Sequence, residues 1–208
     1  MAVLTIDHLS LEIAYPDFEY GWVYYDIWLR WRGEPVINDA ILKRRNEHWA
    51  KRGVGAIKAC ESGGCGILPL LRESLETNTS GYWEGTDPDV LFAVYMNDGF
   101  PFLPSKRIVI YESPEMKAMR EERSARRAKY GPLPDDYVEL ILFVDAYTFE
   151  GADAYYDNGV CFRMSPQRAQ LTKFYEDLRA EYVAFKDRHA VDAYNREDLG
   201  PDYKEEWF

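Results

Sequence analysis

The stretch YGWVYYDIWLRW, residues 20–31, decides the fold class of this chain. Its side chains alternate at the two-residue period of a β-strand, which separates them into two faces. The stretch therefore predicts a long strand with aromatic side chains on both faces. One face holds Val23, Tyr25, Ile27, Leu29 and Trp31, and the other holds Trp22, Tyr24, Asp26, Trp28 and Arg30.

The segments around this strand predict an antiparallel sheet. Residues 4–15 alternate in their second half and are followed by Pro16-Asp17, which predicts a strand that breaks there. A turn at 32–35 leads into a short predicted strand at 36–41. Further strands are expected at residues 89–96, 107–111, 137–147 and 160–164. The strand at 137–147 is apolar on both faces through its middle, so we expect both faces to be covered.

A long amphipathic helix is predicted after the last of these strands. Ser165-Pro166 is typical of a helix start, with Ser165 as N-cap and Pro166 as the first helical residue. We expect the helix to pack on one face of the sheet, because its apolar residues recur at spacings of three and four. The fold class is therefore α+β, a single domain over residues 1–208 with a mostly antiparallel sheet. The apolar stripe consists of Leu171, Phe174, Tyr175, Leu178, Tyr182 and Phe185.

Three segments need a separate interpretation. Residues 114–129 are highly charged and predict an exposed helical insertion, and residues 195–208 form an acidic C-terminal tail. Residues 67–76 have Leu68, Leu71 and Leu75 at helical spacing, yet polar turn residues and Tyr82-Trp83 follow them. This order favours a β-hairpin over a helix.

Composition and charge restrict the class of protein. The chain has 208 residues, of which 47% are hydrophobic and 15% aromatic, so intrinsic disorder is excluded. Its net charge of −11 disfavours nucleic acid and anionic membranes as partners and favours basic proteins. Three cysteines, no basic and apolar leader and no apolar run of 18 residues predict a reduced, soluble, cytoplasmic protein without a membrane span.

The loop CESGGCG, residues 60–66, contains two candidate thiolate ligands for a metal, Cys60 and Cys65. A zinc site needs about four ligands. Cys161 and the three histidines are scattered and supply no second pair. The loop therefore favours a glycine-rich turn in which the cysteines pack as small apolar residues, and no cofactor is predicted.

This part of the chain resembles a group of small uncharacterised bacterial proteins that have a G-x-P turn and a loop of the form C-x-C-G-x-x-G-C. The likeness covers residues 22–85: Gly33-Glu34-Pro35 is similar to the turn, and Cys60, Gly64 and Cys65 are similar to the end of the loop. Lys58 stands where the leading cysteine of the family pattern belongs. The resemblance implies bacterial origin, a β-rich core and a hairpin after Cys65, and it implies no activity.

Two groups of side chains are candidate binding sites. Seven acidic residues and no Lys or Arg lie between residues 130 and 162, which predicts an acidic docking surface or, as alternatives, a cation site or a plain solvated edge. Asp26 shares a strand face with aromatic side chains and could bind a cation or a partner's arginine. In the alternative, the C-terminal helix covers that face and Asp26 pairs with Arg30 or a tyrosine. The candidate residues are Asp145, Glu150, Asp153, Tyr155, Tyr156 and Asp157 in the first group and Trp22, Tyr24, Asp26 and Trp28 in the second.

Two functions from different classes fit these features. The first is a bacterial protein-binding module of the immunity or antitoxin type, which inhibits a basic partner such as a nuclease toxin. The alternative is an enzyme that acts on a small molecule or glycan with carboxylates at strand ends and a Trp/Tyr face. Homo-oligomerisation through a sheet edge or the aromatic face is a third hypothesis. No catalytic residue is predicted.

Overall fold

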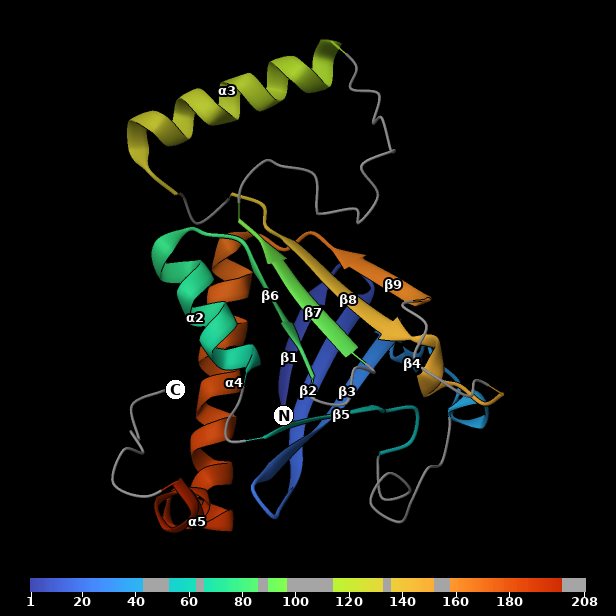
Figure 1. Cartoon of the computed structure of the whole chain (residues 1–208). Helices are drawn as coiled ribbons and strands as arrows, with labels where there is room; N and C mark the ends of the chain where they lie inside the picture. Colours follow the sequence, from blue (N-terminus) through green and yellow to red (C-terminus); the bar gives the residue numbers. More distant parts are fainter. Residues whose placement is uncertain are drawn as a thin grey trace.

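The computed structural model describes residues 1–42, 53–62, 66–85, 90–96, 114–132, 136–151 and 158–199. These residues form two antiparallel sheets and a set of helices, which confirms the α+β class (Figure 1). The predicted strand at 107–111 lies outside the described residues, as do residues 200–208 of the acidic tail.

The first sheet has five strands centred on β3 (Trp22–Trp31), the strand that the opening stretch predicts. β1 (Ala2–Ile6) pairs with β2 (Leu9–Glu19), β2 pairs with β3, and both β4 (Glu34–Pro35) and β5 (Ile57–Ser62) pair with the other side of β3. Val23, Tyr25 and Ile27 are completely buried, so this face of β3 points into the core.

Two strand predictions in this sheet are wrong in detail. Pro16 does not break β2, because a β-bulge between Ala14 and Asp17 accommodates the proline and the strand continues to Glu19. Residues 36–41 are not a strand: the pairing stops at Pro35, and a 3-10 helix, η1 (Asp39–Ile41), follows. The Asn38 side chain accepts a hydrogen bond from the Ala40 backbone N–H at 2.8 Å and so caps that helix.

The second sheet contains β6 (Gly81–Glu84), β7 (Val90–Tyr95), β8 (Glu139–Asp145) and β9 (Gly159–Met164), in that order. The strands predicted at 89–96, 137–147 and 160–164 are thereby confirmed. The inner faces of the two sheets share one hydrophobic core, in which the rings of Tyr25 and Trp83 lie 5.3 Å apart. Ile141 and Phe143, on the outer face of β8, are only half-buried. This face is therefore only partly covered, whereas the sequence predicts that both faces are covered.

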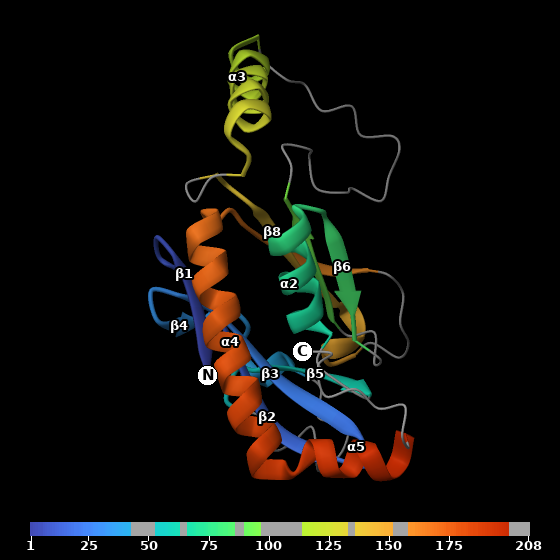
Figure 2. The same ribbon diagram turned by 90° about the vertical axis from the view of Figure 1, so that its left-hand side faces the viewer.

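The predicted C-terminal helix is α4 (Arg168–His189), which packs against β1 and β2 (Figure 2). Tyr182 of α4 contacts Tyr15 of β2 with ring centroids 5.2 Å apart. The predicted start is wrong, since the N-cap is Gln167. The Ser165 hydroxyl instead donates to the Glu139 carboxylate, at 3.0 Å from its nearer oxygen, so it does not cap the helix. α4 is followed by α5 (Val191–Leu199).

Residues 67–77 form a helix, α2 (Ile67–Thr77), and not half of a hairpin. Ile67, Leu68 and Leu71 are completely or almost completely buried, as their helical spacing requires. The turn residues that favoured a hairpin end the helix instead: Asn78 is its C-cap in the left-handed conformation, at φ 55°. Tyr82 and Trp83 then pair with β7, so the hairpin implied by the family resemblance is wrong as well.

The charged insertion forms α3 (Pro114–Tyr130), which stands apart from both sheets in two views (Figures 1 and 2). Near its C-terminal end Arg127 forms an ion pair with Asp136, with 3.3 Å between Nε and Oδ2. No helix within the described residues has the length and apolar character that crossing a membrane requires.

Candidate functional site

The outer face of the five-stranded sheet contains the predicted aromatic and acidic group. We call it the Asp26 face and define it by Trp22, Tyr24, Asp26, Trp28, Lys58 and Cys60. The strand register places Lys58 of β5 opposite Asp26 and Cys60 opposite Tyr24. Asp26 and Lys58 are only 4% and 2% exposed, although they lie on the side of the sheet away from the core and α4. Contrary to the alternative considered for Asp26, α4 does not cover this face.

Asp26 is occupied by partners within the chain. Its Oδ1 lies 3.4 Å from the Lys58 ammonium, and its Oδ2 accepts a hydrogen bond from the Gly53 N–H at 3.0 Å. The predicted pairing with Arg30 or a tyrosine is wrong, since Arg30 pairs with Glu12 at 2.9 Å. The pKa of Lys58 is lowered by burial, and the neighbouring Asp26 carboxylate opposes that shift.

The segment that includes Gly53 and Val54 packs directly on Trp28 of this face. The Trp28 indole donates to the Val54 carbonyl oxygen at 3.1 Å. A Cβ atom at Gly53 would lie 2.4 Å from the Trp28 ring, so the close approach requires glycine. Asp26 and Lys58 therefore form a buried structural pair that an external partner does not reach.

Cys60 is a buried thiol of β5 that forms no disulfide, and it is not part of a glycine-rich turn. Its neighbours along the strand alternate as a strand requires, with Ile57 and Ala59 in the core and Lys58 on the outer face. Cys65, the second candidate metal ligand, lies outside the described residues. Within the residues that the structure describes, no three His, Cys, Asp or Glu side chains come together as a metal site would need.

The acidic group between residues 130 and 162 is only partly described. Asp145 is buried, and its carboxylate accepts a hydrogen bond from the Tyr147 N–H at 2.7 Å, which caps the 3-10 helix η2 (Ala146–Thr148). Glu150 is exposed, and its backbone N–H donates to the Ile41 carbonyl oxygen at 2.9 Å. The remaining predicted residues lie outside the described part: Asp153, Tyr155, Tyr156 and Asp157.

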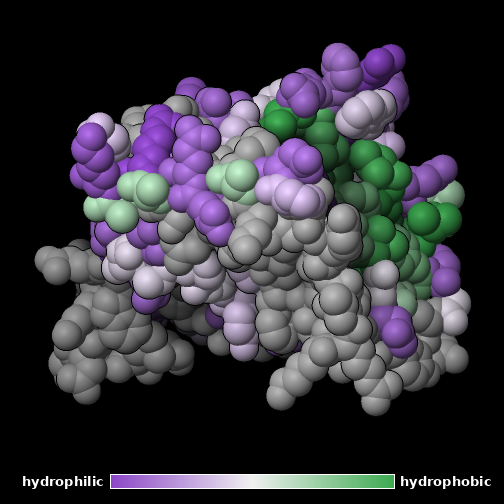
Figure 3. Space-filling view, turned by 90° about the horizontal axis from the view of Figure 1, so that it is seen from above, coloured by the Kyte–Doolittle hydropathy of each residue, from purple (hydrophilic) through white to green (hydrophobic). Residues whose placement is uncertain are grey.

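The outer face of the four-stranded sheet was not predicted as a site. We call it the Tyr82 face and define it by Tyr82, Glu84, Leu91, Ala93, Tyr95, Ile141 and Phe143, which the strand registers place on one side of the sheet. Tyr82 is 69% exposed. Figure 3 shows the molecule from above, where apolar side chains form a patch beside polar ones; the members of the Tyr82 face follow from the strand registers. Exposed Cys161 and Arg163 of β9 continue the Tyr82 face.

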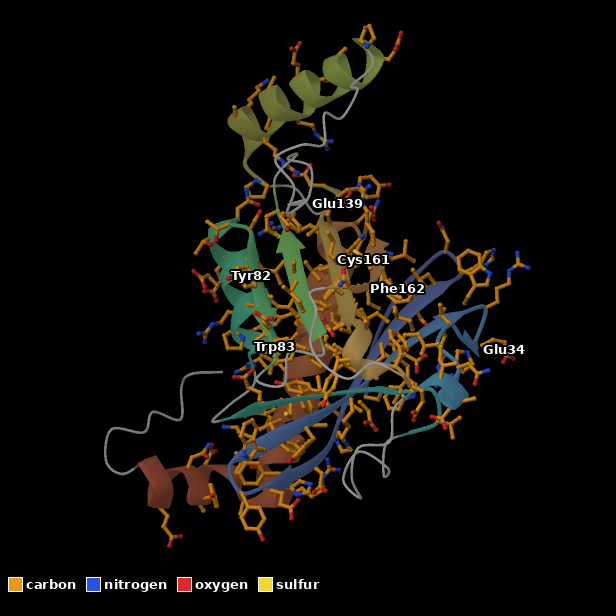
Figure 4. All side chains as sticks on the ribbon, turned by 45° about the vertical axis from the view of Figure 1, so that its right-hand side comes forward. Glu34, Tyr82, Trp83, Glu139, Cys161 and Phe162 are labelled. Atoms are coloured by element: carbon orange, nitrogen blue, oxygen red, sulfur yellow. The ribbon has the colours of Figure 1, made fainter. Side chains whose placement is uncertain are left out.

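Two hollows meet at Tyr82. A cavity of about 470 Å³, which we call the β6 groove, lies between α2 and β6 and is lined by Pro69, Leu70 and Glu73 of α2 and by residues 79–83. A second cavity of about 520 Å³ lies on the Tyr82 face and includes Glu84 and Tyr95 in its lining. Tyr82 and Trp83 follow each other on β6, next to α2 (Figure 4).

Two glycines allow β6 and α2 to pack closely, and a half-buried carboxylate of β5 binds Trp83 of β6. A Cβ atom at Gly81 would lie 2.8 Å from a Leu70 methyl carbon, and one at Gly66 would lie 2.1 Å from the Trp83 ring. The Trp83 indole donates to the carboxylate of Glu61, whose pKa is raised by burial. The walls of the β6 groove are thus fixed by contacts on the core side of the sheet.

The chain matches no protein-family model, no curated protein and no solved structure. The function must therefore be inferred from the chain's own residues.

Proposed function

We propose that the protein is a non-enzymatic protein-binding module that holds a basic partner at Tyr82. The single observation that carries this proposal is the setting of Tyr82, a mostly exposed aromatic side chain between two hollows of about 470 and 520 Å³. Glu73 lines the first hollow and Glu84 the second. An aromatic anchor with carboxylates on both sides is typical of a surface that binds basic segments.

The charge of the whole chain supports the same class of partner. A net charge of −11 steers positively charged proteins toward the surface and repels nucleic acid. An inhibitor of a basic enzyme, such as a bacterial immunity protein or antitoxin against a nuclease, is the form of this function that we propose. The docking residues expected from the sequence, Asp153 and Asp157, lie outside the described residues and stay a prediction.

The alternative, an enzyme acting on a small molecule or glycan, receives less support. Acid–base chemistry requires at least two titratable groups that converge on the reacting atoms. Among the described residues, each of the two hollows is lined by a single carboxylate, Glu73 or Glu84. Asp26 and Asp145, the carboxylates with the deepest burial, are engaged in structural contacts.

A cytoplasmic location is part of the proposal. Of the cysteines that the structure describes, Cys60 and Cys161 form no disulfide, as expected in a reducing compartment.

The test begins with affinity capture from the native host at two salt concentrations, followed by kinetics with the purified partner. We expect Tyr82→Ala to weaken binding about 30-fold or more, as for a central aromatic anchor worth ~2 kcal/mol. We expect Glu84→Lys mainly to slow association and to reduce its salt dependence.

Tyr130→Ala is the matched control, because Tyr130 is a similarly exposed tyrosine at the end of α3, away from both hollows. Both tyrosine variants should keep their free energy of unfolding within about 0.5 kcal/mol of wild type. Equal affinities of the wild type, Tyr82→Ala and Glu84→Lys proteins for the partner would contradict the proposal.

A further inference from the structure

We propose that the partner occupies the β6 groove as an extended basic segment that adds a strand to the free edge of β6. This inference rests on the proposed function, and it specifies how the partner is recognised. Strand addition uses main-chain hydrogen bonds for affinity and alternate side chains for specificity.

The edge of β6 is the first observation behind this inference. Within the described chain, β6 pairs with β7 alone and is the first strand of its sheet. The groove is lined by both Tyr82, which points to the outer face, and Trp83, which points to the core. A cavity that includes residues of both faces lies along the edge of the strand, where an added strand would pair.

The direction of the backbone groups is the second observation. The Gly85 N–H donates to the Val90 carbonyl oxygen at 3.1 Å. Because hydrogen-bonded and non-hydrogen-bonded pairs alternate in an antiparallel ladder, Trp83 bonds to β7 while Tyr82 and Glu84 form the intervening pairs. The N–H and C=O groups of Tyr82 and Glu84 therefore point away from β7. They offer four hydrogen bonds to an incoming strand.

The side chains around the groove select the chemistry of that strand. Pro69 and Leu70 of α2 form an apolar wall, and Glu73 adds a carboxylate at the rim. Glu84 supplies a second carboxylate on the Tyr82 face. Successive residues of a strand point to opposite sides, so a segment that alternates apolar and basic residues would satisfy the apolar wall and the carboxylates together.

A second copy of this chain is a less suitable occupant. Two molecules of net charge −11 repel each other, and a second copy would add its own Glu73 and Glu84 to an edge that already has these two carboxylates. Charge complementarity thus favours a basic segment from a different protein.

The first experiment uses a fluorescein-labelled peptide, Lys-Val-Arg-Val-Lys-Val-Arg, with its affinity measured by fluorescence anisotropy at low salt. Two N-methylated forms are compared, one methylated at the three valines and one at the two internal basic residues. Only one of these sets of N–H groups can face β6. We expect one form to bind about 10-fold or more weakly, because its methyl groups remove the hydrogen bonds to the Tyr82 and Glu84 carbonyl oxygens. The other form should bind as the parent peptide does.

The second experiment follows backbone amide exchange by NMR and needs no variant that has to fold. In the free protein the Tyr82 and Glu84 amides should exchange quickly, and the parent peptide should slow both. The Trp83 amide, which bonds to β7, is the internal control and should exchange slowly with and without peptide.

The outcomes separate this inference from the function on which it rests. If the peptide binds and Tyr82→Ala weakens it, yet both methylated forms bind equally, strand addition is overturned and the binding module stands. If the peptide does not bind and Tyr82→Ala leaves the natural partner's affinity unchanged, both proposals fail. Protection of the Tyr82 and Glu84 amides that rises with protein concentration, without peptide, would show a second copy in the groove and overturn the inference.

Discussion

The Asp26 face and the Tyr82 face are built from the same kinds of side chain, yet one is closed and the other open. Each is the outer face of an antiparallel sheet and combines tyrosine, a carboxylate and a cysteine. On the Asp26 face a lysine from the neighbouring strand neutralises the carboxylate, and the segment that includes Gly53 and Val54 packs on Trp28. On the Tyr82 face Tyr82 and Glu84 stay exposed. A carboxylate among aromatic residues is thus a binding feature only where the chain itself does not satisfy it.

The largest expected contrast between the two faces is in thiol reactivity. Cys60 of the Asp26 face is buried and Cys161 beside the Tyr82 face is exposed. In a Cys65→Ser background under native conditions, we expect iodoacetamide to label Cys161 about 100-fold or more faster than Cys60, because Cys60 must wait for the structure to open. Mass spectrometry of digests taken over time measures both rates.

The pH dependence of this labelling sharpens the comparison. Partial burial raises the pKa of the Cys161 thiol above its ordinary value of 9.0. The thiolate is the reactive form, so the rate at Cys161 should still rise as the pH passes 9. Rapid labelling of Cys60 in the folded protein would show that the Asp26 face is not closed.

The next largest effect is expected on the free energy of unfolding, when the buried ion pair between Lys58 and Asp26 is broken. Lys58→Ala leaves the Asp26 carboxylate buried without its cation, which should lower the free energy of unfolding by about 3–5 kcal/mol. Urea denaturation followed by tryptophan fluorescence measures this change.

Arg30→Ala is the control from the same face of the same sheet. Arg30 is 26% exposed and Glu12 keeps the Ser10 hydroxyl as a second hydrogen-bond partner, so the loss of this pair should cost less than the loss of the Lys58–Asp26 pair. A double variant, Asp26→Leu with Lys58→Met, should recover most of the stability lost in Lys58→Ala, since no uncompensated charge remains. Equal effects of Lys58→Ala and Arg30→Ala would contradict the structural role of the buried pair.

The smallest expected effect concerns Glu61, which holds Trp83 at the wall of the β6 groove. Burial raises the pKa of Glu61 in the folded protein above 4.5, the ordinary value that it has in the unfolded chain. At a pH between the unfolded and the folded pKa, the Glu61 carboxyl therefore holds its proton in the folded protein and has lost it in the unfolded chain. The contribution of this proton to the free energy of unfolding is fully present below pH 4.5, and it is lost as the pH rises through the raised pKa of the folded protein.

Glu61→Gln removes this titration and keeps an oxygen that accepts from the Trp83 indole. The variant should gain stability relative to wild type between pH 4 and pH 7, by less than about 1 kcal/mol because solvent screens the half-exposed carboxylate. Urea denaturation at both pH values measures the difference. A relative gain toward low pH would contradict the assigned direction.

The sequence predicts the fold where one period of hydrophobicity dominates. β3 and α4 are examples, because Val23, Tyr25 and Ile27 alternate cleanly and Leu171, Phe174 and Leu178 recur at helical spacing. α2 was mistaken for a strand because the helical spacing of its leucines competed with the turn residues that follow them. β5 was missed because Lys58 and Glu61 interrupt its apolar pattern, and only the tertiary ion pair makes a buried lysine acceptable.

The candidate site was harder to predict than the fold. Asp26 stands out in the sequence, but its partner Lys58 is 32 residues away and is recognised only from the strand register. Tyr82 and Glu84 occupy a four-residue strand in which nothing local indicates an edge. Whether a strand lies at the edge of a sheet depends on the order of all strands in that sheet. The alternation of apolar and polar residues indicates which face of a strand is buried, but it does not indicate this order.

The connection that contains α3 should tolerate changes in its length. It runs between Tyr95, the last residue of β7, and Glu139, the first of β8, and these two residues are paired in the sheet. The entropy of closing such a loop grows only with the logarithm of its length, by about 0.6 kcal/mol for each doubling. Shortening or lengthening the connection should therefore cost the β7–β8 pairing little, and this position is where a reporter domain could be inserted without rebuilding either sheet.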